Sequence, residues 1–474
     1  MRRLLSVLAP SVRSVSPCAI LLACTSVAAA QAQPPSTQSS ENAAQPQVAA
    51  QAASPPPGPA NRPPFPNRAN EVMPSWLRLR GEFRERVEGF SNSGFVDERD
   101  DAYFLSRVRL TATATGKALA ATIQVQDARV GGKSVGPTGA PFSSAFDLRQ
   151  GFVDIGSAKA KMAVRAGRQE IAFGDQRLVG HAGWLNTART FDAARVTLRT
   201  APAQVDLFAA SVVRPLADEF DKSGNGNRFA GAYVSSGRLL PLATAEPYVF
   251  YRRDTNQRAE SGSFGSLDQV TIGGRLAGKL PARLDYNVEM DLQRGSLGPD
   301  SVRAWAGHWQ IRESLAGPGM PRVTAEYNFA SGDENPVDGT RGTFDQLYPT
   351  AHDKYGLADQ VGWRNIHDVR VGLELTPFKA TPITINYHSY WLAETRDALY
   401  AASGAPLARV IAGAASGRVG QEIDLQFTRP LFPQLALTAG YAHFFAGPFL
   451  KQATPGASYS HPFAMITYVF LAER

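Results

Sequence analysis

The stretch from Trp76 to Val87 alternates apolar and charged side chains, and only Glu85 interrupts the pattern. Apolar Leu77, Leu79, Phe83 and Val87 alternate with charged Arg78, Arg80, Glu82, Arg84 and Arg86. Successive side chains of a β-strand point to opposite faces, so this stretch has one apolar face and one arginine-rich face. A soluble sandwich places the charged face in bulk water, whereas a transmembrane barrel places it along an aqueous lumen. The first architecture is expected of a surface enzyme or binding module, and the second of a pore.

Short alternating runs continue after Ser75, separated by turn residues and without a helical period. We predict 18 strands of about ten residues, the length that a tilted strand needs to cross a bilayer. They start near Trp76, Ala102, Ala118, Phe146, Lys161, Phe191, Gln204, Arg228, Thr244, Asp268, Ala282, Val302, Pro321, His367, Pro382, Arg418, Gln434 and His461.

The connections between these strands differ in length according to parity. Connections after even-numbered strands are short, such as Gly116-Lys117, whereas most of those after odd-numbered strands are long, such as Gly167–Thr190 and Ser331–Ile366. Outer-membrane barrels have short periplasmic turns and long extracellular loops, and a soluble sandwich has no reason to sort its loops in this way. The sequence therefore predicts an all-β chain, a single transmembrane antiparallel barrel in a Gram-negative outer membrane.

The N-terminal part reads as an export signal followed by a linker. Arg2 and Arg3 precede an apolar run from Cys18 to Val27, and cleavage is expected after Ala30 or Ala32. A lipobox-like Leu21–Cys24 leaves open lipidation at Cys24 instead. We assign residues 1–32 to the signal, residues 33–74 to a disordered periplasmic linker rich in Pro, Ala and Gln, and residues 75–474 to the barrel.

Composition excludes several classes of function. Loss of the signal lowers the formal charge of +7 by three units, so the basic excess is modest, and an exported chain is not expected to bind nucleic acid. Both cysteines lie in the signal, which leaves the exported chain without disulfides. The seven histidines form no HExxH, and no GxSxG or phosphate loop is present, so we expect no enzyme and no cofactor.

Strand alternation places a series of arginines toward the lumen on the first, second, fifth and sixth predicted strands. The predicted substrate pathway consists of Arg78, Arg80, Arg84, Arg86, Arg107, Arg109, Arg165, Arg195 and Arg199. Arginine binds carboxylates through two hydrogen bonds, so such a ladder suits an anionic solute. Alternatively, these arginines pair with lumen acids such as Glu82, or form a transverse field with Glu289 and Asp291 across the barrel.

Two of the long connections contain further candidate residues. Arg168, Asp175 and Arg177, in the connection Gly167–Thr190, are candidates for a constriction, with Asp175 paired to Arg177 or to a lumen arginine; a plain surface loop is the alternative. In residues 331–366, Asp333, Glu334 and Asp338 form an oxygen-rich cluster that suits Ca²⁺, although its spacing is not that of an EF-hand and a solvated acidic loop is the simpler interpretation.

Two segments resemble the alginate export family of outer-membrane barrels. The first is RAGRQEIAFGDQRLVGHAGWLNTARTFDAARV at Arg165–Val196; the second, within Ala330–Ile366, contains SGDENPVDGT followed by GTFDQLYPTAHDKYGLADQVGWRNI. The resemblance extends over most of the chain after Ser75. It implies a large monomeric barrel, typified by a secretion channel for a polyuronate.

The sequence thus predicts a channel that passes an anionic, alginate-like polysaccharide or oligosaccharide through an arginine-lined lumen, in contact with outer-membrane lipid. A general or anion-preferring uptake porin is the first alternative. A lipid-anchored surface binding protein or enzyme is the second. A passive pore conducts in both directions, so export and uptake stay open.

Overall fold

The computed structural model describes residues 68–157, 159–240 and 243–471. The predicted signal, and the predicted linker up to residue 67, lie outside the described residues. Within residues 33–74, assigned to a disordered linker, Ala69–Val72 form a short helix, α1. The Asn70 amide holds this helix to the barrel by donating to the Leu79 carbonyl (2.7 Å) and accepting from the Leu79 N–H (2.9 Å). Residues 69–72 are therefore structured, although they fall in the segment assigned to the linker.

The wall of the barrel contains 18 antiparallel strands, the number predicted from the sequence. They are β1 (Leu77–Phe90), β2 (Asp101–Thr115), β3 (Leu119–Gly131), β4 (Ser144–Ile155), β5 (Met162–Gln169), β6 (Phe191–Thr200), β7 (Ala203–Arg214), β8 (Lys222–Leu240), β9 (Ala243–Arg258), β10 (Phe264–Leu280), β11 (Leu284–Leu297), β12 (Asp300–Ser314), β13 (Arg322–Ala330), β15 (Ile366–Phe378), β16 (Thr381–Trp391), β19 (Arg418–Phe432), β20 (Leu435–Ala446) and β21 (Tyr459–Phe470).

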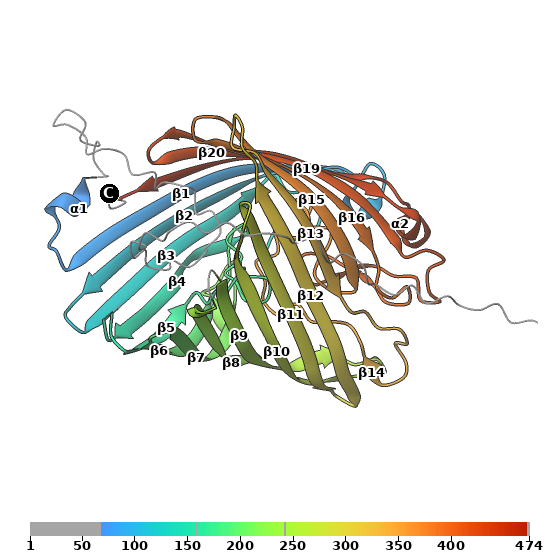
Figure 1. Ribbon diagram of the computed structural model, residues 1–474, viewed down its shortest axis with the longest axis horizontal. Helices are drawn as coiled ribbons and strands as arrows, with labels where there is room; N and C mark the ends of the chain where they lie inside the picture. Colours follow the sequence, from blue (N-terminus) through green and yellow to red (C-terminus); the bar gives the residue numbers. More distant parts are fainter. Residues whose placement is uncertain (1–67, 158, 241–242, 472–474) are drawn as a thin grey trace, which may run out of the picture. The chain divides into compact units, whose positions relative to one another are not determined.

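Each wall strand pairs with its neighbours in chain order, as the tilted ribbons of Figure 1 show. The barrel closes where β1 pairs with β21, from Gly81 opposite Phe470 to Glu88 opposite Phe463. Closure leaves no free sheet edge, which is what a bilayer requires of a β-structure. β8 begins at Lys222 rather than near Arg228. Its first residues were missed in the sequence because they are polar, contain glycine and lack the alternation by which a strand is recognised.

The remaining elements are short and lie in the connections. They are η1 (Ser93–Phe95), β14 (Thr340–Arg341), β17 (Leu399–Tyr400), β18 (Pro406–Ala408) and α2 (Pro448–Ala453). No helix among the described residues is long and apolar enough to cross a membrane. The parity rule holds in the structure, since the long connections 170–190, 331–365 and 392–417 all emerge from the end of the barrel opposite the short turns 116–118 and 201–202. By the usual orientation, the long connections mark the extracellular end.

The two faces of the wall separate apolar from polar side chains. Large apolar residues are exposed on its outer face, for example Phe83, Val87, Leu110, Ile123, Val153, Leu207, Ile272, Leu292, Val371, Ile385, Leu425 and Ile466. Arginines and acids occupy the alternate, inward positions, where many of them are buried. The first strand therefore exposes Phe83 and Val87 on the outer face of the barrel, as its alternation predicts.

Two connections fold back inside the barrel and bury these inward positions. We call residues 170–190 the first inner loop and residues 331–365 the second inner loop. Their apolar side chains, among them Ile171, Phe173, Tyr348, Tyr355 and Trp363, join inward-facing aromatic residues of the wall in one buried cluster. The extracellular half of the lumen is thus lined and partly filled by folded loops.

Candidate functional site: the arginine wall and the inner loops

Four of the nine predicted pathway arginines, Arg84, Arg86, Arg107 and Arg109, lie on the inner faces of β1 and β2, and we call them the arginine wall. All four are buried, with at most 9% of each residue exposed. They come together because β1 and β2 pair in register, with Arg84 opposite Arg107 and Glu82 opposite Arg109. The face on which these four side chains lie is the one that alternation predicts, and their role in a substrate pathway stays a prediction.

Backbone carbonyls of the first inner loop accept hydrogen bonds from the guanidinium groups of these arginines. Arg84 donates to the carbonyl oxygens of Gly183 (2.9 Å), Trp184 (3.1 Å) and Leu185 (3.3 Å). Arg107 donates to the carbonyls of Gly183 and Leu185, each at 3.2 Å. Because loop carbonyls carry only partial charge, these arginines hold the loop against the wall while keeping their net positive charge.

Arg86 contacts the same loop through an aromatic ring as well as through a carbonyl oxygen. Its guanidinium lies 3.8 Å from the centre of the Trp184 ring and donates to the Trp184 carbonyl at 2.7 Å. The Trp184 ring also stacks on His352 of the second inner loop, with ring centres 3.8 Å apart. Trp184 therefore connects the arginine wall to both inner loops.

Acids of the same strands neutralise part of the ladder. Glu82 lies 2.5 Å from Arg107 and 4.0 Å from Arg109, and Glu88 lies 2.5 Å from Arg86. Arg109 also donates to Gln126 at 2.7 Å. Four arginines face two glutamates, so the wall keeps an excess of positive charge.

The other predicted pathway residues lie toward the ends of the wall. Arg165 and Arg195 pair with the inward carboxylates of Asp154 (2.7 Å) and Asp206 (2.9 Å). The remaining three lie near the periplasmic turns: Arg78 donates to the Pro74 carbonyl, Arg199 donates to the Ala160 carbonyl, and Arg80 is exposed. Among the described residues, Arg80 has no hydrogen bond or ion pair, so its guanidinium is available to a solute.

The expectation that Arg168 belongs to the inward-folding connection is wrong. β5 extends to Gln169, and alternation places Arg168 on the face opposite to the inward Arg165. There Arg168 pairs with Asp192 at 2.8 Å and donates to the Leu148 carbonyl. The sequence predicts an end of this strand before Gly167, which is too early. In the structure, Arg168 belongs to the strand and is separated from Asp175 and Arg177, the other two constriction candidates.

Asp175 and Arg177 lie together in the first inner loop. Arg177 contacts Asp175 at 3.1 Å and also the buried Glu326 of β13 at 2.9 Å. Lys354 of the second inner loop reaches Asp175 at 3.2 Å. Although burial opposes ionisation, Lys354 and Arg177 hold the pKa of Asp175 below its ordinary value, and the Glu326 carboxylate raises that of Arg177.

The two inner loops are joined by their backbones. Val179 and Tyr348 form a parallel bridge, and the Tyr348 N–H donates to the Leu178 carbonyl at 2.8 Å. The Thr350 hydroxyl accepts from the Ala182 N–H (3.0 Å) and donates to the Gln176 amide oxygen (2.8 Å). The loops therefore form one folded unit.

The second inner loop binds acids and amides of the opposite walls. The Ala358 N–H donates to Glu422 of β19 at 2.8 Å, and the Asp345 backbone exchanges hydrogen bonds with Gln293 of β11. Gly356 has φ +100°, and a Cβ there would lie 2.5 Å from the Glu422 carboxylate, so the close approach requires glycine. Together, the loops contact the wall at β1–β2, at β11–β13 and at β19.

A second, acidic wall faces this unit. Buried inward carboxylates occur on β11, β13, β15 and β19: Glu289, Asp291, Glu326, Asp368, Glu422 and Asp424. Sequence identified Glu289 and Asp291 by alternation but gave no role to the others. Arg177 and Arg370 pair with Glu326, and His388 contacts Asp368, so these carboxyl groups are partly compensated. The transverse field between the two sides of the lumen stays a prediction.

One inward arginine was missed in the sequence although its signal was present. Arg149 of β4 is buried and donates to Gln124 at 2.6 Å, and it pairs with Glu170 of the first inner loop. Phe146 and Leu148 are exposed on the outer face, so alternation would have placed Arg149 inward. It extends the arginine wall from β1 to β4.

The oxygen-rich candidates for Ca²⁺ do not gather into a site. Asp333 accepts from the Asn335 N–H and Asp338 from the Thr340 N–H, as acids do in turns. No group of three or more His, Cys, Asp or Glu side chains that could hold a metal ion occurs in the part of the chain that the structure describes.

The family of the chain follows from comparison with known sequences. The model of the family described as alginate export matches residues 75–463, which are nearly the whole barrel. This chain belongs to the alginate export family. With the closed barrel and its apolar outer face, this membership makes the protein a channel of the Gram-negative outer membrane. No curated protein matches the sequence.

Solved structures of the same fold share little sequence with this family member. Acinetobacter baumannii OccAB2 superposes with a TM-score of 0.55 at 10% identity, over 84% of this chain and 99% of that chain. Pseudomonas aeruginosa OccK5 (OpdH) gives 0.54 at 11% identity, over 83% and 98%. Pseudomonas aeruginosa OpdO gives 0.54 at 12% identity, over 85% and 99%. At these identities the likeness establishes the barrel fold alone.

Proposed function

We propose that this outer-membrane channel passes an anionic polysaccharide or oligosaccharide, alginate-like in carrying a carboxylate on each sugar. The observation that carries the proposal is the excess of arginine on the inner faces of β1–β4, combined with membership of the alginate export family. A conducting pore must release its solute, so each contact must be weak. A wet lumen keeps it weak, because one arginine–carboxylate contact near a protein surface contributes at most about 4 kcal/mol before desolvation and screening.

The inner loops define where such a solute would meet the wall. Arg80, exposed toward the periplasmic end, offers a free guanidinium, whereas Arg84 and Arg107 are bound by loop carbonyls. Displacement of the first inner loop would expose Arg84, Arg86 and Arg107 together. Passage of a polymer therefore requires the loop to leave the wall, and the solute's carboxylates would replace the loop's carbonyls.

An anion-preferring channel for small solutes is the second candidate. It is favoured by the size of the spaces that the loops leave, since two cavities beside them measure about 190 and 330 Å³. Such spaces suit a monosaccharide or disaccharide acid better than a polymer. Neither candidate needs a cofactor or a chemical step.

Planar-bilayer recording tests the proposal. We expect a reversal potential in a KCl gradient that shows chloride preference, and block by oligouronates that a neutral oligosaccharide of equal length does not produce. Block by monomeric uronate with no effect of longer oligomers would favour the small-solute candidate. Potassium preference without oligouronate block would falsify the anionic pathway.

A further inference from the structure

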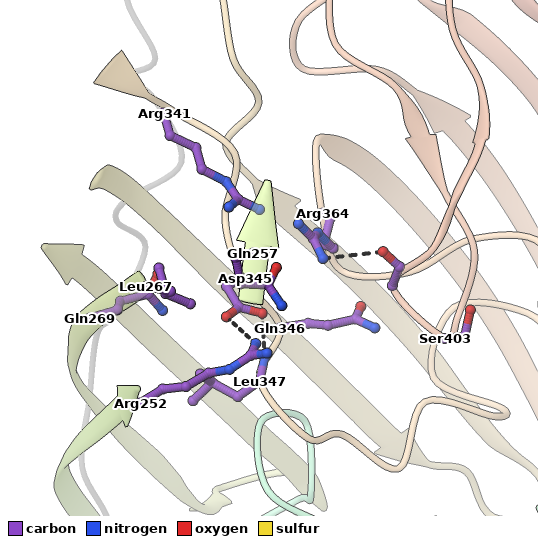
Figure 2. A pocket seen from close by; sticks show the side chains of 11 residues that line it. Arg252, Gln257, Leu267, Gln269, Arg341, Asp345, Gln346, Leu347, Arg364 and Ser403 are labelled. Carbon is purple, nitrogen blue, oxygen red and sulfur yellow. Dashed lines mark hydrogen bonds and ion pairs between the residues drawn. The ribbon is translucent and has the colours of Figure 1, made fainter. Parts of the chain in front are cut away.

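A second cluster of arginines lies on the other side of the barrel from the arginine wall. Arg252 of β9, Arg341 of β14 and Arg364 of the second inner loop line a cavity of about 190 Å³ together with Asp345. Figure 2 shows Arg341, Arg364 and Arg252 directed toward one another from different elements, with Asp345 and Gln257 between them. Loop folding brings these side chains together, so their spacing in the sequence gives no sign of the site.

The charges of this cavity do not balance. Its lining contains three arginines and a single acid, Asp345, which pairs with Arg252 at 2.6 Å; Arg252 also pairs with Asp254 at 3.1 Å, so the excess positive charge belongs to Arg341 and Arg364. Among the described residues, neither Arg341 nor Arg364 has a carboxylate within ion-pair distance. Arg364 donates to the Gly404 carbonyl at 3.1 Å and lies over the Tyr400 ring at 4.5 Å. Both contacts leave its positive charge uncompensated.

Several buried donors of the lining also lack acceptors. Within the described chain, Nε of Arg252, Nε of Arg364 and Nε2 of Gln269 are buried without a hydrogen-bond partner. Gln269 is only 2% exposed. Buried donors are normally paired, so a cavity with three unpaired donors and excess positive charge is suited to an anion with several oxygens. Burial and the neighbouring charge of Arg364 lower the pKa of Arg341, and Asp345 only partly opposes them.

We propose that this cavity binds the carboxylate end of a single uronate sugar, between Arg341 and Arg364, as a docking site separate from the arginine wall. The volume is below the roughly 300–1,000 Å³ of pockets for drug-sized ligands, so it accommodates one sugar ring or one chain end. Gln269, whose Nε2 has no hydrogen-bond partner among the described residues, supplies an amide group for a hydroxyl, whereas the amides of Gln257 and Gln346 already donate to Asp254 and to the Ala402 carbonyl. The choice of a uronate rests on the proposed function; the anion site itself rests on the cavity.

Titration calorimetry on the purified full chain in detergent tests this site. D-glucuronate is expected to bind, whereas D-glucose, which has the same ring without the carboxylate, is not. Arg341→Gln and Arg364→Gln should each weaken glucuronate binding by about tenfold or more, the loss that one charge-assisted hydrogen bond represents. Arg364→Lys should recover part of the affinity.

Arg409→Gln is the matched control. Arg409 is exposed in the connection 392–417, and its Nε donates to the Arg396 carbonyl, so the variant loses the same charge outside the cavity. Equal weakening in this variant, or no glucuronate binding to a chain that shows heat-modifiable migration, overturns the site. Inorganic phosphate that binds as tightly as glucuronate overturns the assignment to a uronate.

The outcomes separate this site from the proposed function. A chloride-selective channel blocked by oligouronates, in which Arg341→Gln and Arg364→Gln bind glucuronate normally, contradicts only the docking site. A potassium-selective channel that loses glucuronate binding in both variants contradicts only the anionic pathway.

Discussion

An arginine on a lumen wall acts differently when its donors face water and when carbonyl oxygens occupy them. Arg84 is of the second type, with contacts to three successive carbonyls of the first inner loop. Arg84→Met keeps the length and removes the donors, so the free energy of opening of residues 183–186 should fall by about 1–3 kcal/mol. Hydrogen exchange of these amides measures the change.

Arg80→Met is the matched control, since it removes the same charge from the same face of β1 at an exposed position. It should leave exchange in residues 183–186 unchanged. Equal exchange in both variants would mean that Arg84 does not anchor the loop.

His352 predicts a dependence of loop docking on pH. Burial lowers the pKa of His352, but Asp359 at 2.9 Å, assisted by Asp353 and opposed by Arg86, raises it above the ordinary value of 6.5. A group whose pKa is raised on folding stabilises the folded state fully below about pH 6.5, and this contribution is lost as the pH rises through the folded pKa. The inner loops should therefore open more readily at about pH 9 than at about pH 6.

Hydrogen exchange at the two pH values, corrected for intrinsic rates, checks this expectation. His352→Gln keeps a polar side chain next to Trp184 and Asp359 but does not titrate, so its exchange should lose the dependence. Loops that are equally protected at both pH values in the unaltered protein would show that the His352–Asp359 pair does not stabilise the docked loops.

At the level of elements, the inner loops are expected to open as one unit. Thr350 bonds to both Ala182 and Gln176 of the first inner loop. Thr350→Val has nearly the same shape but leaves those two groups unpaired, at a cost of about 1–3 kcal/mol. Exchange should then accelerate in both loops together.

A matched threonine in the wall provides the control for this variant. Thr428 bonds only to Thr438 across β19 and β20, at 3.0 Å, so Thr428→Val should leave both loops unchanged. Faster exchange confined to residues 331–365 in Thr350→Val would show that the two loops open separately.

Strands were predictable from the sequence to a greater extent than the loops. Alternation with period two identifies each strand and its inward face, because lipid and water impose opposite demands on successive residues. The same rule explains the errors: Lys222–Asn227 of β8 is polar and glycine-containing, and Arg168 lies at a strand end whose limit alternation does not mark.

Loop positions follow no comparable rule. Arg341 and Arg364 meet through the fold of the second inner loop, and that fold depends on contacts distant in sequence, such as Ala358 with Glu422. Predicting these residues as a site would have required the tertiary structure. Asp175 and Arg177 were predictable as a pair only because they are two residues apart.

In the whole molecule, inward arginines gather on β1–β4 and buried carboxyl groups on β11–β19, so the effect of a charge change on selectivity should depend on where in the lumen it is made. Arg84, Arg107 and Arg109 also stabilise the fold, and charge reversal at these positions would disturb both properties. Arg80 is exposed and inward, which makes it the position where charge can be changed with the least effect on folding.

Arg80→Glu should move the reversal potential in a KCl gradient toward that of potassium and weaken block by oligouronates, because an acid then faces the solute where a guanidinium stood. Arg303→Glu is the control: Arg303 lies two residues before the outward Trp305, so the same reversal occurs outside the lumen and should leave selectivity unchanged. Both variants should retain heat-modifiable migration. An unaltered reversal potential in Arg80→Glu would mean that the permeating anion does not pass the arginine wall, and the route would then be sought beside Arg341 and Arg364.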